Sequence, residues 1–115
     1  MHALIIEDEF MIATVIEYVL RDCGFDSFDL ASSGEAAIAA ATKRCPDLIT
    51  ADIQLAAGCG IEAIRTICAG PRIPVIFITG QAAAEVRAQV ADYPVLRKPF
   101  SEQTLTYAVA ASLAR

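Results

Sequence analysis

The sequence predicts an α/β fold, a doubly wound three-layer sandwich in which a parallel sheet lies between two layers of helices. Short apolar runs alternate with helix-like segments along the whole length, which is the pattern of consecutive strand–helix units. Three of these runs are almost continuously apolar, as expected of strands buried on both faces. The chain has 115 residues, a usual size for one domain with one hydrophobic core.

The strands and helices follow one another in regular order. We expect strands at residues 3–7, 27–31, 47–52, 74–79 and 93–97. We expect helices at residues 9–23, 33–44, 60–69, 82–91 and 101–114. Gly24 stands where a glycine would end the first helix, and Ser33 and Ser101 stand where serines would cap the second and the last. Right-handed crossovers between these units give a doubly wound sheet.

The composition argues against several classes of partner. The formal charge of -5 and the sequence pI near 4.7 disfavour an unaided grip on nucleic acid or anionic lipid. The most apolar segment, residues 10–20, is flanked or interrupted by Glu9, Glu17 and Arg21, so it is too short and too charged to span a bilayer. Acids at positions 7–9 also argue against a signal peptide.

The cysteines and the single histidine carry no recognisable site. The four cysteines form no CxxC pair, so we expect neither a zinc site nor a disulfide framework. Scattered thiols suit a reduced, cytoplasmic setting. We interpret His2 as a terminal residue without a catalytic role.

Polar residues gather where four of the five predicted strands end. Each has an ordinary explanation when taken alone: an acid at a helix N-terminus, a capped loop, a strand-favouring threonine, a solvated lysine. Because ligands of doubly wound sheets bind at the carboxyl ends of the strands, we expect these side chains to meet in one crevice. They are three acids, one hydroxyl and one lysine: Glu7, Asp8, Asp52, Thr79 and Lys98.

This set of side chains suits magnesium-dependent phosphoryl transfer. Three converging carboxylates repel one another, and Mg²⁺ relieves that repulsion while keeping open positions for a phosphoryl group. Lys98 and Thr79 can then neutralise and donate to the phosphoryl oxygens. Asp52, central among the acids, is the expected nucleophile.

Four short segments together resemble the receiver domain of two-component response regulators. They are IIEDE (5–9), LITADIQ (48–54), VIFITG (75–80) and LRKPF (96–100). The resemblance covers essentially the whole chain, so one receiver domain is expected over residues 1–115. It implies a flavodoxin-like fold with strand order 2-1-3-4-5.

The resemblance also assigns roles to individual residues. It implies that Glu7, Asp8 and Asp52 hold Mg²⁺ together with the main-chain carbonyl of Gln54. Asp52 would accept phosphate from the phosphohistidine of a histidine kinase or a histidine phosphotransfer protein.

The same resemblance assigns the phosphoryl contacts. Thr79 would be the switch hydroxyl, and Lys98 would contact the phosphoryl group. The resemblance also implies a cis bond between Lys98 and Pro99.

The sequence departs from the family where an aromatic switch residue is common. Val95 stands three positions before the lysine, and Ala82 stands where a receiver subgroup with a Phe-Ala-Thr-Gly signature has tyrosine. The segment DIQLAAG (52–58) is similar to receivers of general-stress regulators that carry a sigma-factor-like domain. Gln54 follows Asp52 by two positions, and Gln81 follows Thr79 by two positions. Two roles are open for each glutamine: it orients a water molecule at the phosphate, or it is simply solvated.

Two helix surfaces carry more apolar residues than a simple amphipathic helix needs. In the first helix, Met11, Val15 and Tyr18 form a second apolar line, and we expect Met11 and Val15 to contact the kinase or phosphotransfer protein. The fourth helix, expected to be the least firmly packed, and the outer face of the last are candidates for a downstream partner or a homodimer. That outer face carries Tyr107, Ala110, Ala111 and Ala114.

Three functions fit these features to different degrees. The favoured one is a stand-alone receiver, a phosphorylation switch or phosphate relay that catalyses only its own phosphorylation and dephosphorylation. A small Mg²⁺-dependent phosphohydrolase with an aspartate nucleophile is an alternative, although Asp52 lacks the DxD motif of such enzymes. A pseudo-receiver that binds partners without phosphorylation is disfavoured, because the acids, Thr79 and Lys98 are all present.

Overall fold

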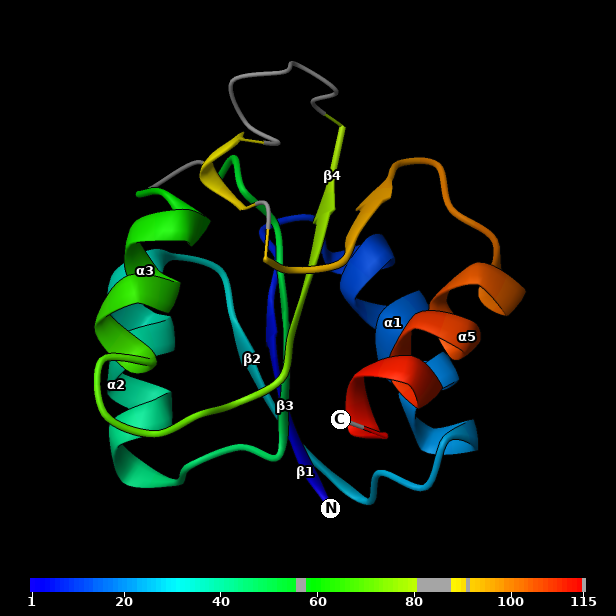
Figure 1. Cartoon of the computed structure of the whole chain (residues 1–115), viewed down its shortest axis with the longest axis horizontal. Helices are drawn as coiled ribbons and strands as arrows, with labels where there is room; N and C mark the ends of the chain where they lie inside the picture. Colours follow the sequence, from blue (N-terminus) through cyan, green and yellow to red (C-terminus); the bar gives the residue numbers. More distant parts are fainter. Residues whose placement is uncertain (56–57, 81–87, 91, 115) are drawn as a thin grey trace.

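A five-stranded parallel sheet forms the middle layer of the protein (Figure 1). The computed structural model describes residues 1–55, 58–80, 88–90 and 92–114. The strand order is β2-β1-β3-β4-β5, and every pair of neighbours is parallel. Helices α2 and α3 cover one face of the sheet, and α1 and α5 cover the other (Figure 1). The predicted doubly wound architecture and strand order are therefore confirmed.

The strands lie close to their predicted positions but are mostly shorter. They are β1 (His2–Ile6), β2 (Ser27–Ala31), β3 (Leu48–Ala51), β4 (Val75–Thr79) and β5 (Val95–Arg97). Two of the predicted acids, Glu7 and Asp52, directly follow the ends of β1 and β3 rather than forming their last residues. Each acid therefore lies where the chain leaves the sheet.

The described helices are α1 (Phe10–Asp22), α2 (Gly34–Lys43), α3 (Gly60–Ile67) and α5 (Glu102–Leu113). Both predicted serine caps are confirmed, because Ser33 accepts from the N–H of Ala36 and Ser101 from that of Thr104. Gly24 follows the C-cap of α1 with a φ of 101°, the left-handed conformation that favours glycine. Most of the helix predicted at 82–91 lies outside the described residues.

The core consists of two apolar layers, one on each face of the sheet. Alternation along the strands divides the side chains between them: Leu4 and Ile6 face α2 and α3, whereas Ala3 and Ile5 face α1 and α5. All five residues of β4 are buried, as a central parallel strand requires. The sheet is thus held from both sides, and its carboxyl edge is a firm base for the polar residues.

His2 is part of the sheet despite its place near the terminus. It lies within β1 and is only 3% exposed. All four cysteines are free thiols. Within the described ranges, every helix is too short or too polar to cross a lipid bilayer.

Candidate functional site

The predicted polar residues lie together at the carboxyl edge of the sheet. Glu7 and Asp8 follow β1, Asp52 follows β3, Thr79 ends β4 and Lys98 follows β5. Strands β1, β3 and β4 are direct neighbours, so their carboxyl ends are adjacent. Glu7, Asp8 and Asp52 each offer a carboxylate oxygen, and these oxygens all lie within 4.8 Å of one another. The sequence prediction of one acidic cluster agrees with this geometry.

Asp52 is held firmly by its own backbone and by the loop that follows. Its N–H donates to the carbonyl of Ile6 at 2.9 Å, which continues the pairing of β3 with β1. Its Oδ1 accepts from the N–H of Gln54 at 3.1 Å. The residue is only 6% exposed, so its carboxylate has little freedom to turn away from the crevice.

Gly60 is a functional position that the sequence analysis missed. A Cβ at this residue would overlap the carbonyl oxygen of Asp52 and would lie 2.9 Å from the carbonyl carbon. The N–H of Gly60 also donates to the carbonyl of Ile53 at 3.0 Å. The start of α3 therefore presses against the backbone of the proposed nucleophile, and only glycine fits there. The sequence contained one indication of this contact. A glycine stands at the expected start of the third helix, eight residues after Asp52.

Lys98 links two of the acids. Its Nζ donates to Oδ2 of Asp52 at 2.9 Å and forms an ion pair with Oε1 of Glu7 at 2.8 Å. Its backbone N–H donates to the carbonyl of Thr79 at 2.9 Å, which ties the lysine to the end of β4. The Lys98–Pro99 peptide bond is cis, as the resemblance implied. The lysine side chain is 16% exposed, so its charge acts mainly within the crevice.

Burial alters the ionisation of the cluster. Removal from water raises the pKa of Glu7 above its usual value of 4.5, and the nearby charge of Asp52 acts in the same direction. Lys98 opposes this shift without cancelling it. Burial alone would lower the pKa of Lys98, but its contacts with Glu7 and Asp52 outweigh burial and raise that pKa.

The residues present fit a divalent cation. Oε1 of Glu7 is buried, and Nζ of Lys98 lies 2.8 Å from it. A carboxylate oxygen has two lone pairs, so it can contact the ammonium and a cation at the same time. With all three acids ionised, one ammonium leaves two negative charges uncompensated. An all-oxygen set with one or two directly bound carboxylates is what Mg²⁺ prefers. Glu7, Asp8 and Asp52 are therefore the residues that would hold it.

The remaining candidate residues lie around this cluster or away from it. The side chain of Gln54 is exposed, and Gln81 lies outside the described residues. Val95 is half-buried and packs against the core on the α2 and α3 face. Met11 and Val15 are exposed on α1, with 81% and 42% of their surface accessible.

Comparison with known proteins identifies the family of this chain. The family model "Response regulator receiver domain" matches residues 3–110. The chain belongs to the response regulator receiver domain family. Receiver domains act in two-component signalling.

Several relatives of this receiver domain combine it with further sequence. It is 30% identical over 97% of its length to the probable transcriptional regulatory protein TcrX of Mycobacterium tuberculosis, covering 49% of that protein. The solution structure of the PhyR receiver domain of Erythrobacter litoralis is 36% identical with a TM-score of 0.83, over 98% of this chain and 89% of that one. Anti-anti-sigma factor PhyR of Bartonella quintana is 34% identical with a TM-score of 0.80, over 98% of this chain and 47% of that one.

The chain spans between about a fifth and a half of the length of the curated relatives that it matches.

Proposed function

We propose that this receiver domain accepts a phosphoryl group on Asp52 in a Mg²⁺-dependent reaction and acts as a phosphorylation switch or phosphate relay. The observation that carries the proposal is the position of the Asp52 carboxylate. It is buried at the carboxyl edge of the sheet, within 4.8 Å of the oxygens of Glu7 and Asp8 and 2.9 Å from Nζ of Lys98. The acid cluster, as a cation site, and the ammonium together would suit an anionic phosphoryl group during its transfer.

The residues of this chain divide the work of the transfer. A carboxylate oxygen of Asp52 attacks the phosphorus of a phosphohistidine, the P–N bond breaks, and its electron pair leaves with the imidazole nitrogen. The N–H of Gln54 holds Oδ1, and Lys98 holds Oδ2, so the attacking group is fixed in place. Mg²⁺, when bound, neutralises charge that builds up on the phosphoryl oxygens.

Lys98 and Thr79 are the groups that we expect to respond to the new phosphate. The ammonium already lies between two carboxylates, so it can move to a phosphoryl oxygen without leaving the crevice. Thr79 is buried at the end of β4, and its carbonyl accepts from the backbone of Lys98. A shift of the lysine is therefore coupled directly to β4. At this site the domain catalyses its own phosphorylation and dephosphorylation.

One experiment separates this function from its two alternatives. The protein is incubated with Mg²⁺ and acetyl phosphate and run on a phosphate-affinity gel beside Asp52→Asn and the exposed control Asp92→Asn. A stable shifted band in the wild type and in Asp92→Asn, but not in Asp52→Asn, is the expected result. Sustained release of phosphate without a shifted band would indicate a phosphohydrolase. An unshifted band without phosphate release would indicate a pseudo-receiver.

The partner that supplies the phosphate is a histidine kinase or a histidine phosphotransfer protein in the cytoplasm, and we propose that it docks on α1. Met11 and Val15 are exposed beside the start of the helix that follows the acidic pair. Met11→Lys combined with Val15→Lys should slow phosphotransfer from the kinase but leave labelling by acetyl phosphate unchanged. Leu30→Lys on β2 is the matched control, because Leu30 is 52% exposed and lies on a different element. If the double variant and the control receive phosphate from the kinase at the same rate, α1 is not the docking surface.

A further inference from the structure

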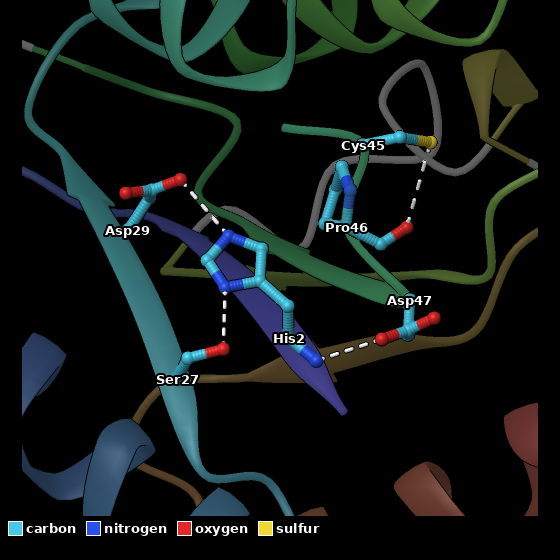
Figure 2. A network of polar contacts seen from close by, with 6 residues as sticks. All are labelled: His2, Ser27, Asp29, Cys45, Pro46 and Asp47. Atoms are coloured by element: carbon cyan, nitrogen blue, oxygen red, sulfur yellow. Dashed lines mark hydrogen bonds and ion pairs between the residues drawn. The ribbon is translucent and has the colours of Figure 1, made fainter. Parts of the chain in front are cut away.

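A second polar constellation lies at the opposite, amino-terminal end of the sheet, far from the acidic crevice in the fold. His2 on β1 pairs in register with Ser27 on β2, so their side chains share one face of the sheet with Asp29 two positions later. Nδ1 of His2 lies 2.9 Å from Oγ of Ser27, and Nε2 lies 2.9 Å from Oδ2 of Asp29. Figure 2 shows the imidazole ring between the serine and the aspartate.

In the neutral form of His2, the hydrogen-bond partners select one tautomer. An ionised carboxylate only accepts, so Nε2 of a neutral His2 carries the proton that Asp29 receives. Nδ1 is then the basic nitrogen, and the hydroxyl of Ser27 must donate to it. The serine proton is thus aimed at a base whose tautomer is held by a carboxylate, which is the arrangement that activates a serine nucleophile.

His2 is rigidly placed for this role. Its ring is buried, with a side-chain exposure of 4%. Its backbone N–H donates to Oδ2 of Asp47 at 2.7 Å, an additional anchor that Figure 2 also shows. Rotation of the His2 ring away from Ser27 would therefore break its contacts with two residues of β2.

The serine and its base border an open groove rather than a closed core. The groove has a volume of about 520 Å³ and lies between β2 and the last turns of α2. That volume falls within the range of small-molecule sites. Its wall combines the small apolar side chains of Ala39 and Ala40 with the cations Lys43 and Arg44. In a chain with a net charge of -5, paired cations beside an activated hydroxyl favour a ligand that carries a negative group.

We propose that Ser27 is a nucleophilic serine that takes an acyl group from small anionic esters bound in this groove. Oγ of Ser27 attacks the ester carbonyl carbon while its proton passes to Nδ1 of His2. The C–O bond to the leaving alcohol breaks, and that alcohol takes the proton back from the imidazolium. Water then repeats the sequence on the acyl-serine, which releases a carboxylic acid and regenerates the hydroxyl. Lys43 and Arg44 bind the anionic group of the ester.

The first test is covalent labelling of the folded full chain with a fluorophosphonate, followed by peptide mass spectrometry. We expect label on Ser27 and none on Ser32, an exposed serine in the same β2–α2 region that serves as internal control. Replacing His2→Gln removes the base, and we expect labelling to slow by about 100-fold. Asp29→Asn, which weakens the hold on the tautomer, should slow it as well. Circular dichroism establishes that each variant is folded, and Asp29→Asn carries the comparison should His2→Gln unfold.

The second test is turnover of two esters, 4-nitrophenyl acetate and its anionic analogue 4-nitrophenyl hemisuccinate. The wild type should release 4-nitrophenolate faster from the anionic ester, and Lys43→Gln with Arg44→Gln should abolish that preference. Ser27→Ala measures the background reaction with amines. Asp92→Asn should behave as wild type, because Asp92 is exposed and lies outside the groove. Absence of label on Ser27, or equal labelling of folded wild type and both base variants, would show that the network only braces β2 against β1. Release from Ser27→Ala at the wild-type rate would also overturn the proposal.

Discussion

Replacement of Gly60 by alanine probes how the fold positions its proposed nucleophile. A Cβ at this position would overlap the carbonyl oxygen of Asp52 and would lie 2.9 Å from its carbonyl carbon and 3.3 Å from Cα of Ile53. The obstacle is backbone on both sides, because Asp52 is fixed to β1 by its N–H and α3 is fixed to Ile53 by the N–H of Gly60. The overlap can be relieved only by moving α3 away from the sheet or by moving Asp52.

The size of the effect follows from that geometry. Forcing an extra carbon into a packed site costs about 1–3 kcal/mol, and the better helix propensity of alanine returns less than about 1 kcal/mol. A reacting group displaced by about 1 Å slows a reaction on the order of 100-fold. Gly60→Ala should therefore lower both the free energy of unfolding and the rate at which acetyl phosphate labels Asp52.

Urea unfolding and a phosphate-affinity time course measure these two quantities. Gly70→Ala is the matched control, because a Cβ at Gly70 meets nothing within 4 Å. If Gly60→Ala unfolds at the same urea concentration as Gly70→Ala and is labelled at the same rate, the start of α3 does not position Asp52.

Three further predictions address the charges and thiols of the domain. Lys98→Met removes an ammonium that lies 2.8–2.9 Å from two carboxylates, so it should bind Mg²⁺ more tightly in calorimetric titrations. The same variant should be phosphorylated more slowly. Weaker Mg²⁺ binding would argue against a site in which Lys98 and Mg²⁺ share these carboxylates. The raised pKa of Glu7 means that its ionisation opposes folding, so this penalty is absent below pH 4.5 and is complete once the pH has passed the folded-state pKa. Glu7→Gln should therefore gain stability relative to wild type as the pH rises through that window, and it should bind Mg²⁺ more weakly. A difference in unfolding free energy that does not change with pH would contradict the raised pKa of Glu7. Burial raises the pKa of the half-buried Cys68 thiol, so a disulfide reagent at neutral pH should modify the exposed Cys45 first; the reverse order, read by peptide mass spectrometry, would be inconsistent with the structure.

Sequence periodicity predicted the architecture because the strands of this sheet are buried on both faces. Continuous apolar runs such as those of β1 and β4 leave little doubt about strand identity, and the polar residues that end them mark the carboxyl edge. The fifth strand was predicted two residues too early, because Tyr93 and Pro94 precede β5 rather than forming it. The ring of Tyr93 instead packs edge-on against Phe77 with centroids 5.5 Å apart.

Contacts between segments far apart in sequence were not predictable in the same way. The meeting of Gly60 with Asp52 depends on the path of the loop between them, which no periodicity records. The burial of His2 depends on β1 beginning at the second residue and on β2 and the chain before β3 supplying Asp29 and Asp47. The ion pairs of Lys98 require the relative positions of β1, β3 and β5, which a strand order alone does not fix.

The most direct test of the central claim is chemical identification of the phosphorylated residue. The domain is incubated with a phosphohistidine donor and Mg²⁺, in one sample without a chelator and in a second sample with one. Both samples are then treated with borohydride, which reduces an acyl phosphate of aspartate to homoserine. Peptide mass spectrometry should find homoserine at position 52 only when Mg²⁺ is present, with Asp8 and the exposed Asp92 unchanged. Homoserine at another position, or at position 52 to the same extent in the presence of chelator, would contradict the Mg²⁺-dependent role assigned to Asp52.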